Sequence, residues 1–242
     1  MMRSGNPALR AGTFSRARSF DSTNAMSIQG AVNKTLILLG LTVFSASWVW
    51  DNPAIFIPYI FPALIIGMAI ALITAYKREW APITGPIYAI VEGVFLGAIS
   101  AVFEARYPGI VIQAVGLTFG TLFCMLAVYK TGIIKISRGF ILGVVSATGA
   151  IFLLYVVNMV MSFFGAGIPF IHESGPLGIG FSIFVVIIAA LNLVLDFYVI
   201  EKGAEAGAPK YMEWYGAFAL LVTLIWLYLE ILRLLAKLQN RR

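Results

Sequence analysis

Long apolar runs alternate with short charged or turn-forming breaks along almost the whole chain. A membrane-spanning helix needs about 20 mostly apolar residues. Backbone groups in lipid must find hydrogen-bond partners within the protein, so each such run should be a helix. The pattern predicts an all-α, polytopic membrane protein with a bundle of seven transmembrane helices. The predicted spans are Lys34–Trp50, Phe56–Tyr76, Ile83–Phe103, Ile110–Tyr129, Phe140–Phe164, Leu177–Ile200 and Trp214–Leu235.

The composition also indicates a membrane protein, and it indicates which partners the protein has. The 242 residues are 60% hydrophobic and 12% charged, whereas a soluble domain is about 25% charged. The basic residues form short clusters between apolar runs, which is typical of the ends of membrane spans and not of a nucleic-acid-binding face. One cysteine and one histidine exclude an internal disulfide and a histidine-rich metal site. We expect a lipid bilayer as partner, no nucleic acid and no cofactor.

Three parts follow from these runs. Residues 1–32 contain arginines and serines but lack the apolar core of a cleavable signal, so they are predicted to be a disordered cytoplasmic tail. Residues 33–238 form the transmembrane domain, and residues 239–242 form a basic C-terminal tail.

The distribution of Lys and Arg predicts the orientation. Among the loops on the opposite side, only Arg106 is basic, so the N-terminus is predicted to lie in the cytoplasm. Seven spans would then place the basic C-terminal end outside, unless the last apolar segment is partly re-entrant. Both alternatives stay open. The basic residues assigned to the cytoplasmic side are Arg3, Arg10, Arg16, Arg18, Lys34, Lys77, Arg78, Lys130, Lys135, Arg138, Lys202 and Lys210.

Three acidic residues, Glu92, Asp196 and Glu230, lie well inside apolar runs. An ionised side chain at the centre of a bilayer costs at least about 2.5–3.5 kcal/mol, and such residues normally face a partner, a cavity or an ion pathway. Asp196 shares a helix face with Asn192, four residues earlier. The four residues are therefore candidates for a pH-sensing site or an ion pathway.

Asp196 and Glu230 could act as a pair. Two carboxylates close together in an apolar environment cannot both ionise cheaply, so they would share a proton, and they could also ligate a hard cation such as calcium. The pair requires both helices to extend beyond the membrane, and Glu213 is the alternative partner of Asp196. Two structural alternatives also stay open: Asp196 could reach water at its helix end, and Glu230 could be neutralised by Arg233.

Three segments resemble the Bax inhibitor-1 superfamily, also called the transmembrane Bax inhibitor motif family, and specifically its bacterial branch. "LVLDF", which contains Asp196, resembles the end of the family's sixth helix. "LYLEILRLLAKL" resembles its last helix, with Glu230 where the family usually has aspartate. "YAIVEGVFLGAIS" resembles an element found in parts of the family. The likeness covers about Asn33 to Leu238.

The resemblance implies a seven-helix fold in which the other helices surround the last one. It also implies a pH-gated calcium leak controlled by the carboxylate pair, a cytoprotective role and a bacterial plasma membrane. A basic residue after the family's second helix latches the pair, and Lys77 or Arg78 lies nearest to that position. Some bacterial relatives interact with a membrane-bound AAA protease, so a non-conducting regulator of such a protease is an alternative function.

Particular residues argue against several other functions. An intramembrane aspartyl protease would need an acid where Phe181 stands, and the chain lacks the Gly-x-Ser-Gly element of a rhomboid protease. A retinal protein would need a lysine in the middle of the last span, and Lys237 lies near its end. We expect no enzymatic activity. A proton-coupled secondary transporter stays open, because helices interrupted at Ile57–Pro62 or Gly175–Gly180 could hold a substrate.

Overall fold

The structure, a computed structural model, describes residues 25–165, 168 and 173–241. The predicted disordered tail lies outside these residues as far as residue 24. Regular secondary structure in the described ranges is helical, and a single isolated bridge pairs Ala25 with Pro209. The all-α prediction is confirmed.

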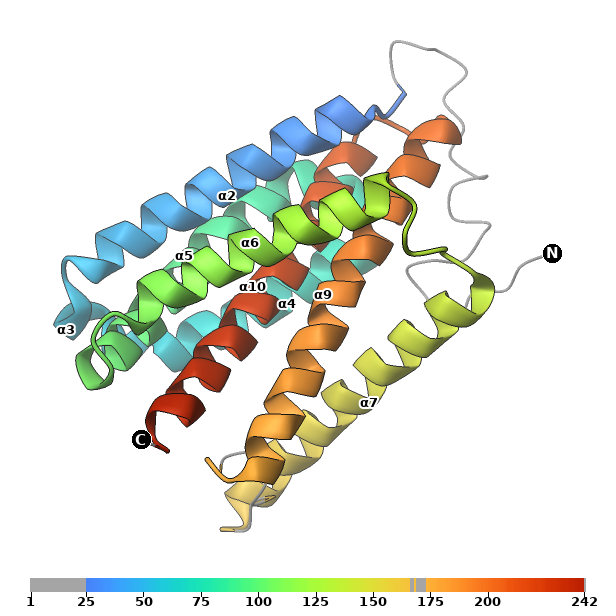
Figure 1. The fold of residues 1–242 in the computed structure, drawn as a ribbon. Coiled ribbons are helices and arrows are strands. Elements are labelled where there is room, and N and C mark those ends of the chain that lie inside the picture. The colour runs from blue at the N-terminus through green and yellow to red at the C-terminus, as the bar shows by residue number, and fades with distance from the viewer. Residues whose placement is uncertain (1–24, 166–167, 169–172, 242) are drawn as a thin grey trace. The chain divides into compact units, whose positions relative to one another are not determined.

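Seven helical segments within the described residues are long and apolar enough to cross a membrane, as predicted. Figure 1 shows their arrangement along the chain. The elements are α2 (Ile28–Trp50), α3 (Pro53–Phe56), η2 (Ile57–Tyr59), α4 (Ile60–Tyr76), η3 (Arg78–Trp80), α5 (Ala81–Arg106), α6 (Ile110–Lys130), α7 (Arg138–Phe163), α9 (Pro176–Glu205) and α10 (Met212–Gln239).

The first span begins at Ile28, ahead of the predicted Lys34. Ser27 has extended backbone angles, and its hydroxyl oxygen accepts a hydrogen bond from the Gly30 amide at 2.9 Å. This is an N-cap, which satisfies one of the free amides at the start of a helix. Residues 28–32 therefore belong to the first span, within the stretch that was predicted to be a disordered tail.

The ends of other helices also differ by a few residues from the ends of the predicted spans. α9 continues to Glu205 and α10 begins at Met212, so both helices extend beyond the predicted spans. α10 is a continuous helix of 28 residues, which favours a crossing segment over a re-entrant one. The interruption expected near Ile57–Pro62 is present as the short 3-10 helix η2, where Pro58 cannot donate a backbone hydrogen bond.

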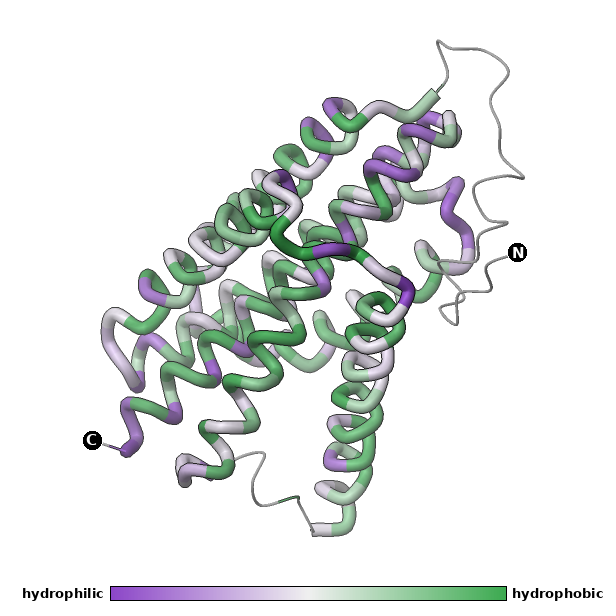
Figure 2. Tube along the Cα trace, turned by 45° about the vertical axis from the view of Figure 1, so that its right-hand side comes forward, coloured by the Kyte–Doolittle hydropathy of each residue, from purple (hydrophilic) through white to green (hydrophobic). Residues whose placement is uncertain are grey.

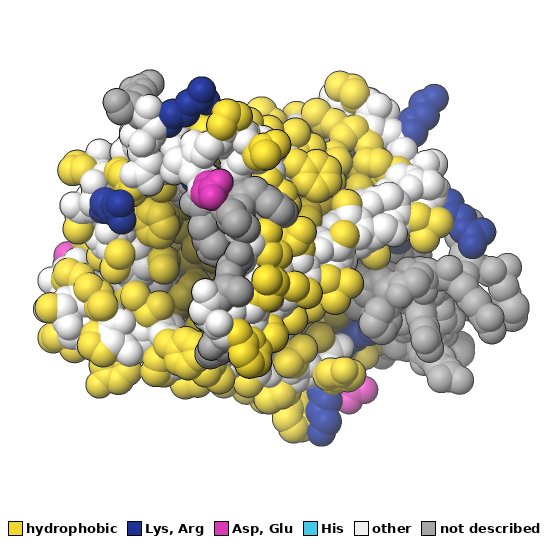
Figure 3. All heavy atoms as spheres, turned by 90° about the horizontal axis from the view of Figure 1, so that it is seen from below, with side chains coloured by type: hydrophobic (Ala, Val, Ile, Leu, Met, Phe, Trp, Pro, Cys, Tyr) yellow, Lys and Arg dark blue, Asp and Glu magenta, His cyan; other side chains and the backbone are white. Residues whose placement is uncertain are grey.

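The outer surface is apolar in a way that suits lipid. Hydrophobic residues dominate the helices in Figure 2, and hydrophobic side chains cover much of the described surface in the view of Figure 3. In the second span, 11% of the most apolar stretch of 18 residues is buried. In α10 the corresponding share is 56%, the largest among the seven candidate spans. The high burial of the last helix agrees with the central position that the family resemblance implies.

The helices form two compact units. Of the described residues, unit 1 contains 25–106 and 196–222, and unit 2 contains 107–165, 168, 173–195 and 223–241. α9 and α10 each contribute to both units. In unit 2, Ile151 of α7, Val185 of α9 and Trp226 of α10 pack in one apolar cluster.

In unit 1, α5 packs against both α2 and α4. A side chain at Gly97 of α5 would lie 2.6 Å from the Ala46 carbonyl oxygen of α2, and one at Gly93 would overlap Thr42 and Ser45. The two glycines therefore let the backbones of α5 and α2 approach closely, as small residues do in membrane helices. Because position 93 faces 42 and position 97 faces 46, the two helices run in the same direction.

Candidate functional site

Glu230 is the most enclosed of the three acids predicted inside apolar runs. It lies on α10 in unit 2 and is 2% exposed. The Tyr155 hydroxyl of α7 donates to its Oε1 atom at 2.9 Å, and Arg233 Nη1 donates to the same atom at 3.0 Å. Arg233 Nη1 also donates to the Tyr155 hydroxyl oxygen at 2.8 Å. Arg233 and Glu230 therefore form a direct ion pair, in agreement with the alternative in which Arg233 neutralises Glu230.

A second cation, Lys237, lies one turn beyond Arg233 and is buried, whereas the Arg233 side chain is 37% exposed. Lys237 is 4% exposed, and its Nζ atom donates to the Gly178 carbonyl at 3.0 Å and to Ser182 Oγ at 2.9 Å. Both partners are uncharged and belong to α9. Glu230, Arg233 and Lys237 thus form one polar face of α10 inside unit 2.

Asn192 of α9 was predicted to share a polar face with Asp196. Its side-chain amide donates to Thr148 Oγ1 of α7 at 2.8 Å and to the Ile188 carbonyl at 2.8 Å. These contacts tie α9 to α7 within unit 2. Its predicted place in an ion pathway stays a prediction.

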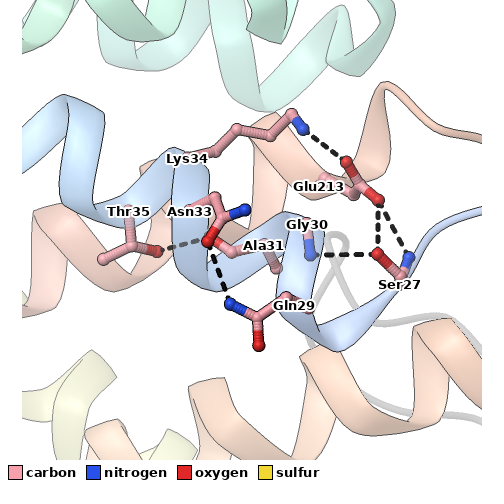
Figure 4. A network of polar contacts seen from close by, with 8 residues as sticks. All are labelled: Ser27, Gln29, Gly30, Ala31, Asn33, Lys34, Thr35 and Glu213. Atoms are coloured by element: carbon pink, nitrogen blue, oxygen red, sulfur yellow. Dashed lines mark hydrogen bonds and ion pairs between the residues drawn. The ribbon is translucent and has the colours of Figure 1, made fainter.

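Glu213 forms a polar cluster at the start of α10 in unit 1 (Figure 4). It is 0% exposed, and its Oε1 atom accepts hydrogen bonds from the Ser27 amide at 2.9 Å and from the Ser27 hydroxyl at 3.0 Å. Lys34 Nζ pairs with the other oxygen at 2.5 Å. Both carboxylate oxygens are therefore engaged by the first turns of α2, a role for Glu213 that differs from the predicted pairing with Asp196.

Gly30 makes room for this cluster. A Cβ atom at position 30 would overlap the Glu213 carboxylate, so α2 must carry glycine there for the acid to reach Ser27. Nearby, the Met26 amide donates to the Ala208 carbonyl at 2.6 Å. The start of α2 is thus attached to the turn between α9 and α10.

Asp196 lies on α9 in unit 1 and is half-buried, and its Oδ2 atom is fully enclosed. Tyr215 of α10 interacts electrostatically with both Asp196 and Arg78. The Arg78 guanidinium lies over the Tyr215 ring at 5.3 Å, whereas Lys77 lies over the Trp80 ring at 4.2 Å. Of the two predicted latch residues, Arg78 is the one that shares a neighbour with Asp196, and the latch itself stays a prediction.

Arg78 also influences a tyrosine in the turn before α10. Burial raises the pKa of the Tyr211 hydroxyl, and the negative charge of Glu79 raises it further. The positive charge of Arg78 opposes both effects. Tyr211 therefore stays a neutral hydroxyl at physiological pH.

Glu92 occupies the middle of α5 in unit 1 and is 7% exposed. Tyr88, one turn earlier, is its hydrogen-bond partner, and the Tyr88 ring packs edge-on against Phe218 of α10 with ring centroids 5.0 Å apart. On the other side, Glu92 lies against Gly67 of α4. Glu92 is therefore enclosed by protein, and its predicted place in a pH-sensing site or an ion pathway stays a prediction.

The predicted pair of Asp196 and Glu230 joins residues of different units, and it stays a prediction. Within the described residues, no group of three or more His, Cys, Asp or Glu side chains could hold a metal ion. Calcium usually takes six to eight oxygen ligands. Calcium ligation by Asp196 and Glu230 stays a prediction.

Comparison with known proteins agrees with this architecture. None of the curated proteins compared with the chain matches it. The model of a family described as Bax inhibitor 1 like matches residues 6–240, which include all seven spans and all the acids discussed above. The chain therefore belongs to the Bax inhibitor 1 like family of membrane proteins.

Proposed function

We propose that this membrane protein is a calcium-permeable leak channel whose opening depends on pH, with a stress-protective role. We place it in a bacterial plasma membrane with its N-terminus in the cytoplasm. The proposal requires no enzymatic step and no resident cofactor. The observation that carries it is Glu230, an acid 2% exposed within a membrane span and held by Tyr155 and Arg233.

Such an arrangement responds to protons in a definite way. An ionised Glu230 is stabilised by the positive charge of Arg233 and by the hydrogen bond from Tyr155. A proton on Glu230 removes its negative charge, so the attraction to Arg233 is lost and the contact between α10 and α7 weakens. Asp196 is the second acid of the proposed sensor. We propose that this change in how α10 is held controls opening.

Membership in the family supports the calcium-leak proposal, together with the resemblance described above. Carboxylate oxygens are also suitable transient ligands for a hard cation such as calcium. A permeant ion needs weak and reversible binding, because it must leave as well as enter. A site with few carboxylate ligands would bind calcium weakly and therefore allow it to pass through.

The experiment is calcium flux into liposomes that contain the purified protein, measured on both sides of neutral pH. The variants are wild type, Asp196→Asn and Glu230→Gln. Glu205→Gln is the matched control, because Glu205 is an acid on an exposed helix end whose side chain is 55% exposed. We expect pH-dependent flux in wild type and in the control, and a lost or shifted pH dependence in the other two variants.

Each outcome has a distinct meaning. Absence of flux in wild type would reject the channel and leave the non-conducting regulator. Calcium movement that requires an opposing proton gradient would indicate a proton-coupled transporter. An unchanged pH profile in Asp196→Asn or in Glu230→Gln would remove that residue from the sensor while leaving the channel in place.

A further inference from the structure

Glu92 is a buried acid whose surroundings differ from those of Glu213 and Glu230. The other two each have a basic partner, Lys34 and Arg233 respectively. Among the described residues, no Lys or Arg forms an ion pair with Glu92. Its hydrogen-bond partner is the neutral Tyr88 hydroxyl.

The position of Glu92 in its span keeps basic residues distant. The third candidate span runs from Arg78 to Arg106, and Glu92 lies at its midpoint. Fourteen helical residues on either side correspond to about 21 Å along the axis. The hydrocarbon core is about 30 Å thick, so both arginines belong near its edges and Glu92 near its centre.

Charged residues of the neighbouring helices also lie away from Glu92. The part of α10 that belongs to unit 1 packs on Tyr88 through Phe218, and its one charged residue is Glu213, at the start of the helix. Lys34 is the one charged residue of α2, and it pairs with Glu213 near the start of that helix. Position 93 faces Thr42 and Ser45, about two turns beyond Lys34. α4 contains no charged residue, and at the level of Glu92 it presents Gly67.

The contact with Gly67 is close. A Cβ atom at position 67 would lie 2.5 Å from Glu92 Oε1 and 3.2 Å from its Cδ atom. The carboxyl group therefore fills the space that a larger residue of α4 would occupy. Any charge on Glu92 lies directly between α5 and α4.

An ionised carboxylate in this position is costly, because Glu92 is 7% exposed and no described Lys or Arg forms an ion pair with it. Glu92 also belongs to no group of three or more His, Cys, Asp or Glu side chains in the described part of the chain that could hold a metal ion. A proton removes the cost of the buried charge and leaves a group that can still hydrogen-bond with Tyr88. We propose that Glu92 is a proton-binding site separate from Asp196 and Glu230, and that its protonated form holds α4 against α5.

The first test uses wild-type protein in lipid nanodiscs and the apolar reagent dicyclohexylcarbodiimide. A protonated carboxyl transfers its hydrogen to a nitrogen of the reagent, and its oxygen bonds to the central carbon, so the product retains all atoms of both. We expect mass spectrometry to find the adduct on Glu92, with labelling that falls as pH rises. Labelling restricted to exposed acids such as Glu205, or absent at every pH, would overturn the proposal.

The second test compares hydrogen–deuterium exchange of α4 in wild type and in Glu92→Gln. Glutamine has the shape of the protonated acid and cannot ionise, so the variant keeps the packing. After correction for the intrinsic pH dependence of exchange, we expect alkaline pH to increase exchange in α4 several-fold in wild type only. An equal increase in both proteins would show that α4 does not respond to Glu92. Neither test depends on ion conduction, so the proton site and the proposed channel can fail independently.

Discussion

The Tyr155 hydroxyl of α7 donates a hydrogen bond of 2.9 Å to Glu230 Oε1 of α10. Arg233 donates to both groups, so each of the three side chains contacts the other two. The Tyr155 ring is held in place by an edge-on contact with Phe181 of α9, with ring centroids 6.2 Å apart. Tyr155 therefore connects the buried acid of α10 to two further helices of unit 2.

We predict that Tyr155→Phe destabilises unit 2. The substitution keeps the ring but removes a hydrogen bond to a charged group, a contribution of about 1.5–3 kcal/mol. Unfolding in mild detergent, followed by circular dichroism, measures the change in the free energy of unfolding. Tyr59→Phe is the control, because Tyr59 is 56% exposed and its hydroxyl can remain in contact with solvent. Equal losses in the two variants would contradict the role given to Tyr155.

A second prediction concerns Lys34 and Glu213, the ion pair between α2 and α10. Lys34→Met leaves the fully buried Glu213 carboxylate without its cation, and we expect a loss of about 3 kcal/mol in unfolding free energy. Glu213→Gln alone leaves Lys34, which is 18% exposed and can turn toward water, so its loss should be smaller. The double variant should recover part of the loss seen in Lys34→Met. Strictly additive effects in this double-mutant cycle would show that the two residues do not couple.

The spans were predictable because their signal is local. Length and hydropathy alone separate the helices, and the acids at positions 92 and 230 stand out because charge is costly in an apolar run. The apolar run begins after Ser27, so hydropathy alone does not indicate that this serine caps the first helix. A serine that comes directly before a helix-forming sequence is a typical N-cap, and this pattern indicates the start of the helix.

Contacts between distant residues were not predictable from one sequence. Ser27 and Glu213 are 186 positions apart, and nothing in the pattern of either segment identifies the other. Lys34 was interpreted as a positive flank of a span, whereas its charge neutralises a specific buried acid. Tyr155 gave no signal, because a tyrosine within an apolar run is common and only the fold shows that its hydroxyl faces Glu230.

Glycines of α2 allow a third prediction with an internal control. A methyl group at Gly30 would overlap the Glu213 carboxylate, whereas one at Gly40 meets nothing within 4 Å. We expect Gly30→Ala to destabilise the protein by about 1–3 kcal/mol through overpacking. Gly40→Ala should be neutral or stabilising by up to about 1 kcal/mol, because alanine favours the helix. The comparison is made by thermal unfolding in the same detergent. A neutral Gly30→Ala would mean that Glu213 can leave its position without cost.

The final prediction compares Arg233 and Lys237, two cations on the same face of α10. Arg233→Met removes the charge that pairs with Glu230, so a buried carboxylate stays with Tyr155 alone, and we expect a loss of about 3–5 kcal/mol in unfolding free energy. Lys237 instead donates to the Gly178 carbonyl and the Ser182 hydroxyl, which are both neutral.

Methionine can replace the aliphatic part of Lys237, and the serine hydroxyl can turn to a carbonyl of its own helix. Removing this charge ends its repulsion of Arg233 and also its smaller attraction to Glu230. We therefore expect Lys237→Met to change the free energy of unfolding by less than about 1 kcal/mol, since replacing a buried charge by an apolar residue of similar volume is often neutral. Denaturant titration of both variants in the same detergent gives the comparison. A loss in Lys237→Met as large as that in Arg233→Met would assign to Lys237 a share in neutralising Glu230.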